Sequence, residues 1–272
     1  MNRYKLIVFD LDDTLLDKQK HIDDSVLESI LRMKKNGYII SSISGRNCSM
    51  MSLYNKQMQI ESFAACNGSL VYINNSIIYS SPISETTVRK LFSLCYRYDM
   101  VFCLFGKYDG YYCRNVPCLS NALNYNKLVQ NHARAISLKY DNEYVNSNVY
   151  KFMVYIDEQK CDIERFTKEV TDIGGLCITI ADKYFEITND DSRKEFALEK
   201  ISKTTGVNRK EIVYFGDSLS DLGALEYSGY SVCMNSSVKE LKAVADDIAK
   251  DNKDINRILL NIEKGLVWKL LY

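Results

Sequence analysis

The feature that most constrains this chain is an apolar run that ends in a cluster of carboxylates. Residues 6–9 are Leu, Ile, Val and Phe, and Asp10, Asp12 and Asp13 follow within four positions. An unbroken apolar run of this kind is typical of a strand that is buried on both faces of a parallel sheet. Three carboxylates at the end of such a strand repel one another unless a cation or a proton lies among them. The sequence therefore predicts a parallel sheet and raises the question of a bound metal.

Composition excludes several classes of protein. The 272 residues include 35 Lys plus Arg and 35 Asp plus Glu, and this balance argues against nucleic acid as a partner. The nine cysteines stand singly, without a C-x-x-C pair, which favours reduced thiols over disulfides or a zinc site. No apolar run approaches the roughly 20 residues that a membrane span needs. We expect a cytoplasmic protein that does not enter a membrane, and its oligomeric state stays open.

The N-terminal part of the chain alternates strands and helices. A helix at residues 21–36 and a strand at residues 38–43 follow the opening strand. Such a β-loop-α-β unit predicts parallel strands with a right-handed crossover. A hairpin is expected next, at residues 69–80, because Asn74 and Asn75 tolerate the positive φ angles of a two-residue turn.

The alternation stops at residue 82 and resumes after residue 188, with helices expected at 194–205 and 254–271. The middle segment predicts helices and paired strands, which is the pattern of a compact α+β module. We therefore expect an α/β protein in which residues 1–81 and 188–272 form a Rossmann-like core with a parallel sheet. Residues 82–187 would form an inserted α+β cap domain.

Polar residues follow several of the expected core strands. Asp10, Ser44, Asn67 and Asp217 each lie at or just beyond a strand end, and ligands of open parallel sheets bind at the carboxyl ends of the strands. Gly45 lets the backbone approach a ligand, and the next helix begins with free N–H groups that suit an anion. Alone, each residue has an ordinary interpretation as a turn, a helix cap or a solvated charge. Together, their placement predicts one polar site.

This set of residues resembles the haloacid dehalogenase superfamily, and in particular its Cof-type branch, subclass IIB, which has a large α/β cap of the C2 type. The resemblance rests on Asp10-Leu11-Asp12-Asp13-Thr14-Leu15, Ser44-Gly45-Arg46, Asn67-Gly68, Lys194 and Gly216-Asp217-Ser218-Leu219-Ser220-Asp221. It covers both core segments, whereas the cap matches only in its placement and in the order of its elements. Asp13 stands where this branch often has Gly, and Ser220 stands where Asn is usual.

The resemblance implies a Mg²⁺-dependent phosphatase that acts through an aspartyl-phosphate. Asp10 would attack phosphorus, and Asp12 would protonate the leaving oxygen and then deprotonate water, so Asp12 must hold a proton near neutral pH. The implied Mg²⁺ ligands are Asp10, the main-chain carbonyl of Asp12, Asp217 and, directly or in an outer shell, Asp221. The implied contacts to phosphate and substrate are Leu11, Ser44, Gly45, Arg46, Asn67, Lys194 and Ser220.

The sequence leaves the substrate open. The resemblance implies small phosphorylated metabolites such as sugar phosphates, with flavin and pyridoxal phosphates as further candidates. A sugar phosphomutase or phosphotransferase would use the same aspartyl-phosphate, and a binding protein without turnover is disfavoured by the intact charged residues. Lys151, on an expected cap strand, either meets an anionic group or lies on a solvated face. The cap aromatics either stack on a substrate or form the cap's own core; they are Phe102, Phe105, Tyr108, Tyr111 and Tyr112.

Overall fold

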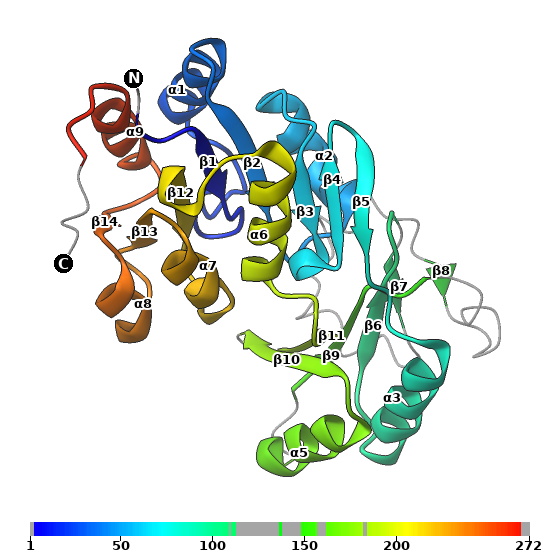
Figure 1. Ribbon diagram of the computed structural model, residues 1–272. Coiled ribbons are helices and arrows are strands. Elements are labelled where there is room, and N and C mark those ends of the chain that lie inside the picture. Colours follow the sequence, from blue (N-terminus) through cyan, green and yellow to red (C-terminus); the bar gives the residue numbers. More distant parts are fainter. Residues whose placement is uncertain are drawn as a thin grey trace.

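Two β-sheets organise the chain (Figure 1). The structure is a computed structural model that describes residues 3–108, 110–112, 136–137, 148–156, 162–181 and 184–267. An eight-stranded sheet has the order β14-β13-β12-β1-β2-β3-β4-β5, and a six-stranded sheet has the order β10-β11-β9-β6-β7-β8. The larger sheet takes its strands from both ends of the chain and the smaller one from the middle. The predicted α/β fold class is confirmed.

The larger sheet is parallel except at one edge. The parallel strands are β1 (Leu6–Phe9), β2 (Ile39–Ile43), β3 (Phe63–Ala65), β12 (Ile212–Gly216), β13 (Tyr230–Met234) and β14 (Asp247–Ala249). β4 (Leu70–Ile73) and β5 (Ser76–Ser80) complete it as an antiparallel hairpin. Asn74 and Asn75 have φ angles of 49° and 61°, which confirms the predicted turn. β14 was not predicted, because only three residues, the first of them Asp247, form it.

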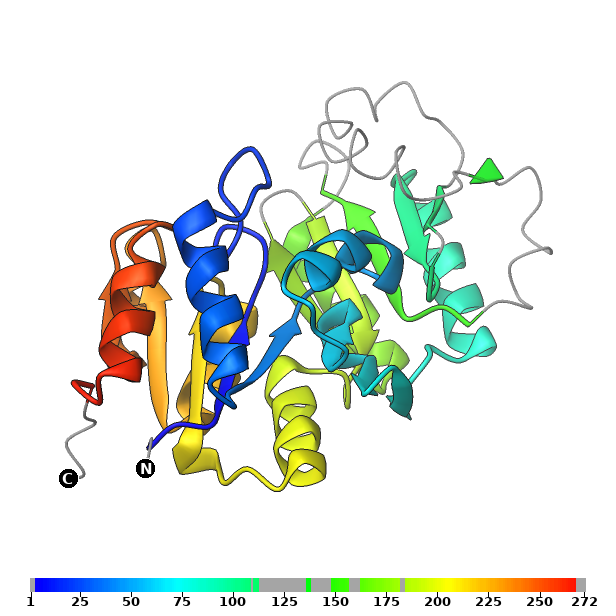
Figure 2. The same ribbon diagram turned by 90° about the horizontal axis from the view of Figure 1, so that it is seen from above.

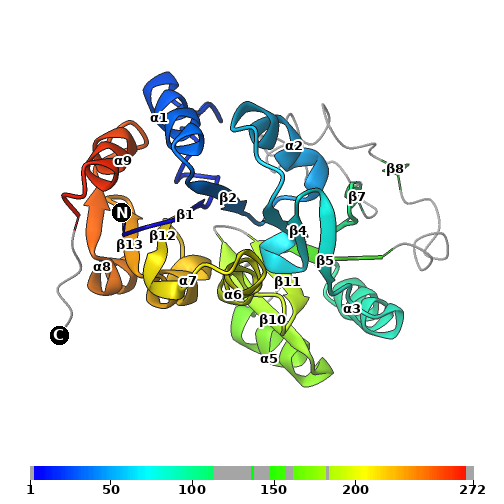
Figure 3. The ribbon, with the colours of Figure 1, turned by 45° about the horizontal axis from the view of Figure 1, so that its top comes forward.

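Helices cover both faces of the larger sheet (Figure 3). The first face carries α1 (Asp24–Lys35), α2 (Cys48–Gln57) and α9 (Ile255–Glu263), and the second carries α6 (Lys194–Thr205), α7 (Leu222–Tyr227) and α8 (Lys239–Val244). Side chains alternate along β1, so Ile7 and Phe9 pack with the first set and Leu6 and Val8 with the second. All four are fully buried, which explains why the opening run is apolar throughout.

One predicted helix is shorter than expected. α9 was predicted to continue to residue 271, but it ends at Glu263. Gly265 follows with a φ of 67°, a left-handed conformation that ends helices. None of the helices in the described ranges has both the length and the apolar character that crossing a membrane requires.

The helices that the structure describes beside the smaller sheet lie on one of its faces. Its strands are β6 (Phe102–Phe105), β7 (Gly110–Tyr112), β8 (Ile136–Ser137), β9 (Lys151–Tyr155), β10 (Leu176–Ala181) and β11 (Tyr184–Asn189), and its helices are α3 (Glu85–Arg97) and α5 (Ile163–Ile173). Figures 1 and 2 show this unit at the opposite end of the molecule from β14 and α9. The assignment of residues 82–187 to a separate cap domain stays a prediction.

The two faces of the smaller sheet have different neighbours. Phe102 and Phe152 pack beneath α3 and α5, whereas Phe105, Tyr150 and Met153 belong to the same apolar cluster as the core residues of α1 and α2. The face of the smaller sheet that is turned away from α3 and α5 therefore packs against the core. The aromatic residues of the predicted cap divide accordingly: Phe102 lies in the apolar cluster of α3 and α5, Phe105 lies in the cluster of α1 and α2, and Tyr108 is exposed. The side chains of Tyr111 and Tyr112 lie outside the described part.

Candidate active site

The register of the larger sheet brings the predicted strand-end residues to one edge. Phe9 lies opposite both Ser42 of β2 and Phe215 of β12. The main-chain N–H of Asp10 donates to the Phe215 carbonyl at 2.8 Å. Because these strands are parallel, the residues that follow β1, β2 and β12 leave the sheet on the same side.

Lys194 joins two buried carboxylates from distant parts of the chain. Its Nζ lies 2.9 Å from Asp10 Oδ1 and 2.8 Å from Asp221 Oδ1. Lys194 is the first residue of α6 and is only 3% exposed. Burial lowers the pKa of Lys194, but the two carboxylates outweigh it and hold the pKa above its usual value. The ammonium group therefore stays charged and links both core segments at the site.

Asp221 is committed to protein donors. Its Oδ1 accepts from Lys194 Nζ at 2.8 Å and from the Tyr214 hydroxyl at 2.6 Å. Its Oδ2 accepts from the main-chain N–H groups of Asp217 and Ser218, at 3.3 and 3.1 Å, and from the Ser218 hydroxyl at 3.0 Å. A carboxylate offers about four lone-pair positions. This arrangement favours Asp221 as an outer-shell group that positions Lys194 over a direct metal ligand.

Asp10 and Asp217 have the properties of a cation site. Together with Asp221, they place carboxylate oxygens within 4.8 Å of one another. Burial raises the pKa of Asp10 well above its usual value, against the effect of Lys194. Burial and the charge of Asp221 raise the pKa of Asp217 to about 6. The Thr14 hydroxyl donates to Asp217 Oδ1 at 2.9 Å and so orients this carboxylate. A hard divalent cation such as Mg²⁺ suits this all-oxygen donor set.

Asp12 is held as a carboxylate by two cations. Arg46 donates through Nε and Nη2 to its two oxygens, at 2.6 and 2.7 Å, and Lys20 Nζ lies 2.9 Å from Oδ1. Burial raises the pKa of Asp12, but these contacts lower it to about 2. The expectation that Asp12 holds a proton near neutral pH is therefore wrong for this arrangement. Arg46, which was expected at the phosphate, is instead bound to Asp12.

The predicted phosphate loop, Ser44-Gly45-Arg46, follows β2 and is fixed to Asn67, just beyond the end of β3. The Asn67 N–H donates to the Ser44 carbonyl at 2.9 Å, and the Arg46 N–H donates to the Ser44 hydroxyl oxygen at 3.2 Å. A Cβ at Gly45 would lie 3.0 Å from Asn67 Oδ1, so a larger residue would crowd the loop. The Leu11 side chain is fully buried, which leaves only its main chain for the site.

Asp13 and Ser220, the two residues that depart from the family pattern, lie at the edge of the cluster of side chains around Asp10. Asp13 has a φ of 57° and a side chain that is 63% exposed. Gly favours this left-handed conformation and Asp tolerates it, which explains why either residue fits. The Ser220 hydroxyl lies 2.8 Å from that of Ser218, so it bonds within its own loop and not toward the phosphate loop.

Four residues at the site were missed by the sequence analysis. Thr14 lies inside the first motif but was given no role, and Lys20 looked like an ordinary loop lysine. Tyr214 looked like a core residue, because it interrupts no apolar pattern in β12. Glu186 lies in β11 of the smaller sheet, and its carboxylate accepts from Lys151 of β9 and from Asn67, in the turn between β3 and β4. Only Thr14 carried a local signal, its place within the motif.

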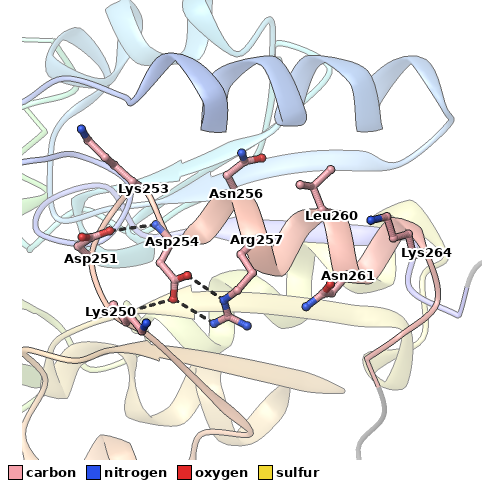
Figure 4. Close-up of a pocket in the computed structure, with 9 residues that line it drawn as sticks. All are labelled: Lys250, Asp251, Lys253, Asp254, Asn256, Arg257, Leu260, Asn261 and Lys264. Atoms are coloured by element: carbon pink, nitrogen blue, oxygen red, sulfur yellow. Dashed lines mark hydrogen bonds and ion pairs between the residues drawn. The ribbon is translucent and has the colours of Figure 1, made fainter.

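A hollow beside α9 lies apart from this group (Figure 4). It is lined by Lys250, Asp251, Lys253, Asp254, Asn256, Arg257, Leu260, Asn261 and Lys264. Its central cation, Arg257, donates to both oxygens of Asp254, at 2.8 and 3.0 Å. None of the lining residues belongs to the group around Asp10, and we assign the hollow no function.

Comparison with known proteins decides the family. The sequence model of haloacid dehalogenase-like hydrolases matches residues 7–260. The chain belongs to this family. The predicted resemblance is therefore confirmed. This haloacid dehalogenase-like hydrolase is a member of an enzyme family, as expected.

Curated relatives of this haloacid dehalogenase-like hydrolase match over most of their length. The putative phosphatase YkrA of Bacillus subtilis is 24% identical, over 90% of this chain and 92% of its own. The 5-amino-6-(5-phospho-D-ribitylamino)uracil phosphatase YitU of the same organism is 25% identical, over 92% and 93%. The pyridoxal phosphate phosphatase YbhA of Escherichia coli is 23% identical, over 91% and 94%.

Solved structures share the fold of this haloacid dehalogenase-like hydrolase. A haloacid dehalogenase-like hydrolase from Bacteroides thetaiotaomicron superposes with a TM-score of 0.83 at 20% identity, over 96% of this chain and 99% of that one. A subclass IIB sugar phosphatase gives a TM-score of 0.80 at 20% identity, over 97% and 100%. These likenesses confirm the fold.

Proposed function

We propose that the chain is a Mg²⁺-dependent phosphatase of small phosphorylated metabolites. The observation that carries the proposal is Asp10, a buried carboxylate at the end of β1 that is bonded to Lys194 and lies within 4.8 Å of Asp217. The relatives support the reaction class, since those named above are called phosphatases. The substrates in the names of YitU and YbhA, together with sugar phosphates, define the panel of esters to test.

Asp10 is the proposed nucleophile. Lys194 holds its Oδ1, and the described residues place no donor on Oδ2. Oδ2 attacks phosphorus, the bond from phosphorus to the leaving oxygen breaks, and an aspartyl-phosphate forms on Asp10. The ester oxygen leaves as an alcohol after it receives a proton, and water later attacks the phosphorus of the aspartyl-phosphate to release inorganic phosphate.

Asp12 is the proposed proton carrier, and it starts as an anion. A bound phosphate dianion competes with Asp12 for Arg46, because guanidinium groups bind phosphate and carboxylate alike. Loss of this contact raises the pKa of Asp12 and lets it carry a proton to the leaving oxygen. When Asp12 gives this proton to the leaving oxygen, it acts as general acid and becomes an anion again. In the second step it acts as general base and accepts a proton from the attacking water.

Mg²⁺ is the proposed cofactor. Asp10, Asp217 and the main-chain carbonyl of Asp12 would hold the ion, with Asp221 behind them as an outer-shell group. When bound, the ion would supply positive charge that neutralises the phosphoryl oxygens and the carboxylates. Ser44, Gly45 and the main-chain N–H of Leu11 are the proposed partners of the remaining phosphoryl oxygens.

The substitution Asp217→Asn separates the destabilising effect of this buried charge from its proposed role in binding Mg²⁺. The folded-state pKa of Asp217 is about 6, above the usual 3.8 of an aspartate. Its charged form therefore destabilises the fold above pH 6, and this effect disappears as pH falls toward 4. Without divalent ions at about pH 8, we expect the variant to be more stable than the wild type by up to about 3 kcal/mol. Thermal unfolding in a chelator, repeated at about pH 5, measures the difference and its decrease.

Added Mg²⁺ completes this experiment. We expect Mg²⁺ to raise the unfolding midpoint of the wild type and to leave Asp217→Asn nearly unchanged. Asp172→Asn, at an exposed position of α5, removes the same charge far from the strand ends and serves as the matched control. An equal Mg²⁺ response in wild type and Asp217→Asn would show that Asp217 does not bind the ion.

Isotopic labelling tests the reaction itself. We expect Mg²⁺-dependent release of inorganic phosphate from an aryl phosphate and from members of the ester panel. In isotopically labelled water, hydrolysis places one solvent oxygen in the released phosphate, because water attacks phosphorus in the second step. A phosphomutase or phosphotransferase moves the group to a hydroxyl and leaves the product phosphate unlabelled. No turnover of any ester in the panel would contradict the proposal and favour a binding protein.

A further inference from the structure

The face of the smaller sheet that is turned away from α3 and α5 presents a charged pair to the core. Along β9 and β11, Phe152 and Phe185 point into the cap's own core, so Lys151 and Glu186 point to the opposite face. Lys151 Nζ lies 2.8 Å from Glu186 Oε1 and 4.8 Å from the centre of the Phe105 ring. Lys151 is fully buried, so the solvated face considered for it is excluded.

Glu186 reaches across to the predicted phosphate loop. Asn67 Nδ2 donates to Glu186 Oε2 at 2.9 Å, and the main-chain N–H of Asn67 donates to the Ser44 carbonyl at 2.9 Å. A Cβ built on Gly45 would lie 3.4 Å from Glu186 Oε2. This carboxylate therefore borders the loop that is proposed to hold the phosphoryl group. The part of a substrate next to its phosphate must pass beside it.

Glu186 is an anion with unused capacity to accept hydrogen bonds. Burial raises its pKa, but Lys151, Asn67 and Lys194 outweigh burial and lower it. Two donors reach it among the described residues, one on each oxygen, and its side chain is 16% exposed. A carboxylate has about four lone-pair positions, so about two remain. Asp221 is the contrast, since five hydrogen bonds and complete burial close it to ligands.

The charge of Glu186 is compensated on the side away from the loop. Lys151 approaches Oε1, whereas Oε2 lies on the Asn67 and Gly45 side. The pair with Lys151 lowers the repulsion that a lone carboxylate would exert on a neighbouring phosphate. A hydroxyl group at this place can donate to Glu186, whereas a second carboxylate would meet like charge and find no donor.

We propose that Glu186 accepts hydrogen bonds from hydroxyl groups of the leaving group and selects polyol and sugar phosphates over esters that carry a carboxylate near the phosphate. This inference rests on the proposed phosphatase function and names the substrate class of the same site. Lys151 and Asn67 are positioning residues, because each holds one oxygen of the Glu186 carboxylate.

Two esters of the same length test the inference. Glycerol 3-phosphate and 3-phosphoglycerate differ in that a hydroxymethyl group of the first is a carboxylate in the second. We expect the wild type to favour glycerol 3-phosphate in kcat/KM by about 10- to 100-fold, the usual effect of one charge-assisted hydrogen bond. In Glu186→Gln we expect this preference to fall by about tenfold or more, since the neutral amide no longer repels the carboxylate.

The ratio of the two kcat/KM values is the decisive readout. If Glu186 only stabilised the fold, the substitution Glu186→Gln would change both kcat/KM values together and leave their ratio unchanged. Glu164→Gln, at an exposed position of α5, is the matched control and should keep the wild-type ratio. If Glu186→Gln folds poorly because Lys151 loses its counter-charge, the double substitution Lys151→Met and Glu186→Gln removes both charges. We expect the same fall in the ratio for it.

Two results would overturn the inference. One is a wild type that hydrolyses both esters equally well, and the other is a folded Glu186→Gln variant that keeps the wild-type ratio. Either result leaves the phosphatase proposal standing, provided that the wild type hydrolyses an aryl phosphate in the presence of Mg²⁺. Absence of hydrolysis of every ester, the aryl phosphate included, overturns the proposed function and the inference with it.

Discussion

Asp10→Asn abolishes phosphate release, with an expected loss of at least about a thousandfold in kcat. The amide cannot attack phosphorus as the carboxylate does, and it carries no charge for the metal. Asn keeps the shape of Asp and an oxygen that accepts from Lys194, which in the wild type lies 2.9 Å from Oδ1. The variant should therefore stay folded. Phosphate release from an aryl phosphate at saturating Mg²⁺ measures the loss, and thermal unfolding verifies the fold.

Asp13→Asn is the matched control for this experiment. It makes the same chemical change three positions away, at a side chain that is 63% exposed and lies 3.8 Å from Lys20. We expect it to retain most of the wild-type activity. If Asp10→Asn also retained it, Asp10 would not be the nucleophile, and the proposed aspartyl-phosphate would have to be abandoned.

Lys194→Met should damage both the fold and the reaction. Met fills a similar volume but leaves Asp10 and Asp221 buried without their shared counter-charge. Breaking a buried ion pair by removing one partner typically costs about 3 to 5 kcal/mol. Urea unfolding at neutral pH in a chelator measures this loss directly. Phosphate release should fall as well, because Asp10 is then more readily protonated and no longer held in place.

Two further variants distinguish this effect from a general defect of α6. Lys203→Met, near the other end of the helix, removes a lysine that is 71% exposed, and we expect little change in stability. The double variant Lys194→Met and Asp221→Asn removes one of the stranded charges and should recover part of the lost stability. Equal stability of Lys194→Met and the double variant would show that the charge of Asp221 does not destabilise the fold once Lys194 is removed.

The sequence predicted the core well because its signals there are local. The apolar run before Asp10 and the turn at Asn74 and Asn75 each determine their own structure within a few residues. Strand ends in a parallel sheet then meet by topology alone. Asp10 and Asp217 could therefore be placed at one edge before any contact between them was known.

The contacts within the site were harder to predict because they join residues that are distant in sequence. Glu186 and Asn67 are 119 positions apart, and no local pattern marks either residue as the partner of the other. The protonation of Asp12 was misjudged for the same reason. Its pKa depends on Arg46, 34 positions away, whose side chain could equally have turned toward a phosphate.

The position of β1 between β2 and β12 has a consequence for the order of events during synthesis. β1 leaves the ribosome early, but β12 is made about 200 residues later. Until then, the edge of β1 that pairs with β12 has no hydrogen-bonding partner strand. Unpaired edges of this kind promote association between nascent chains. The three aspartates that follow β1 place negative charge at the end of this waiting strand. We expect these charges, of which Asp10 and Asp12 are proposed for catalysis, also to discourage aggregation before the core closes.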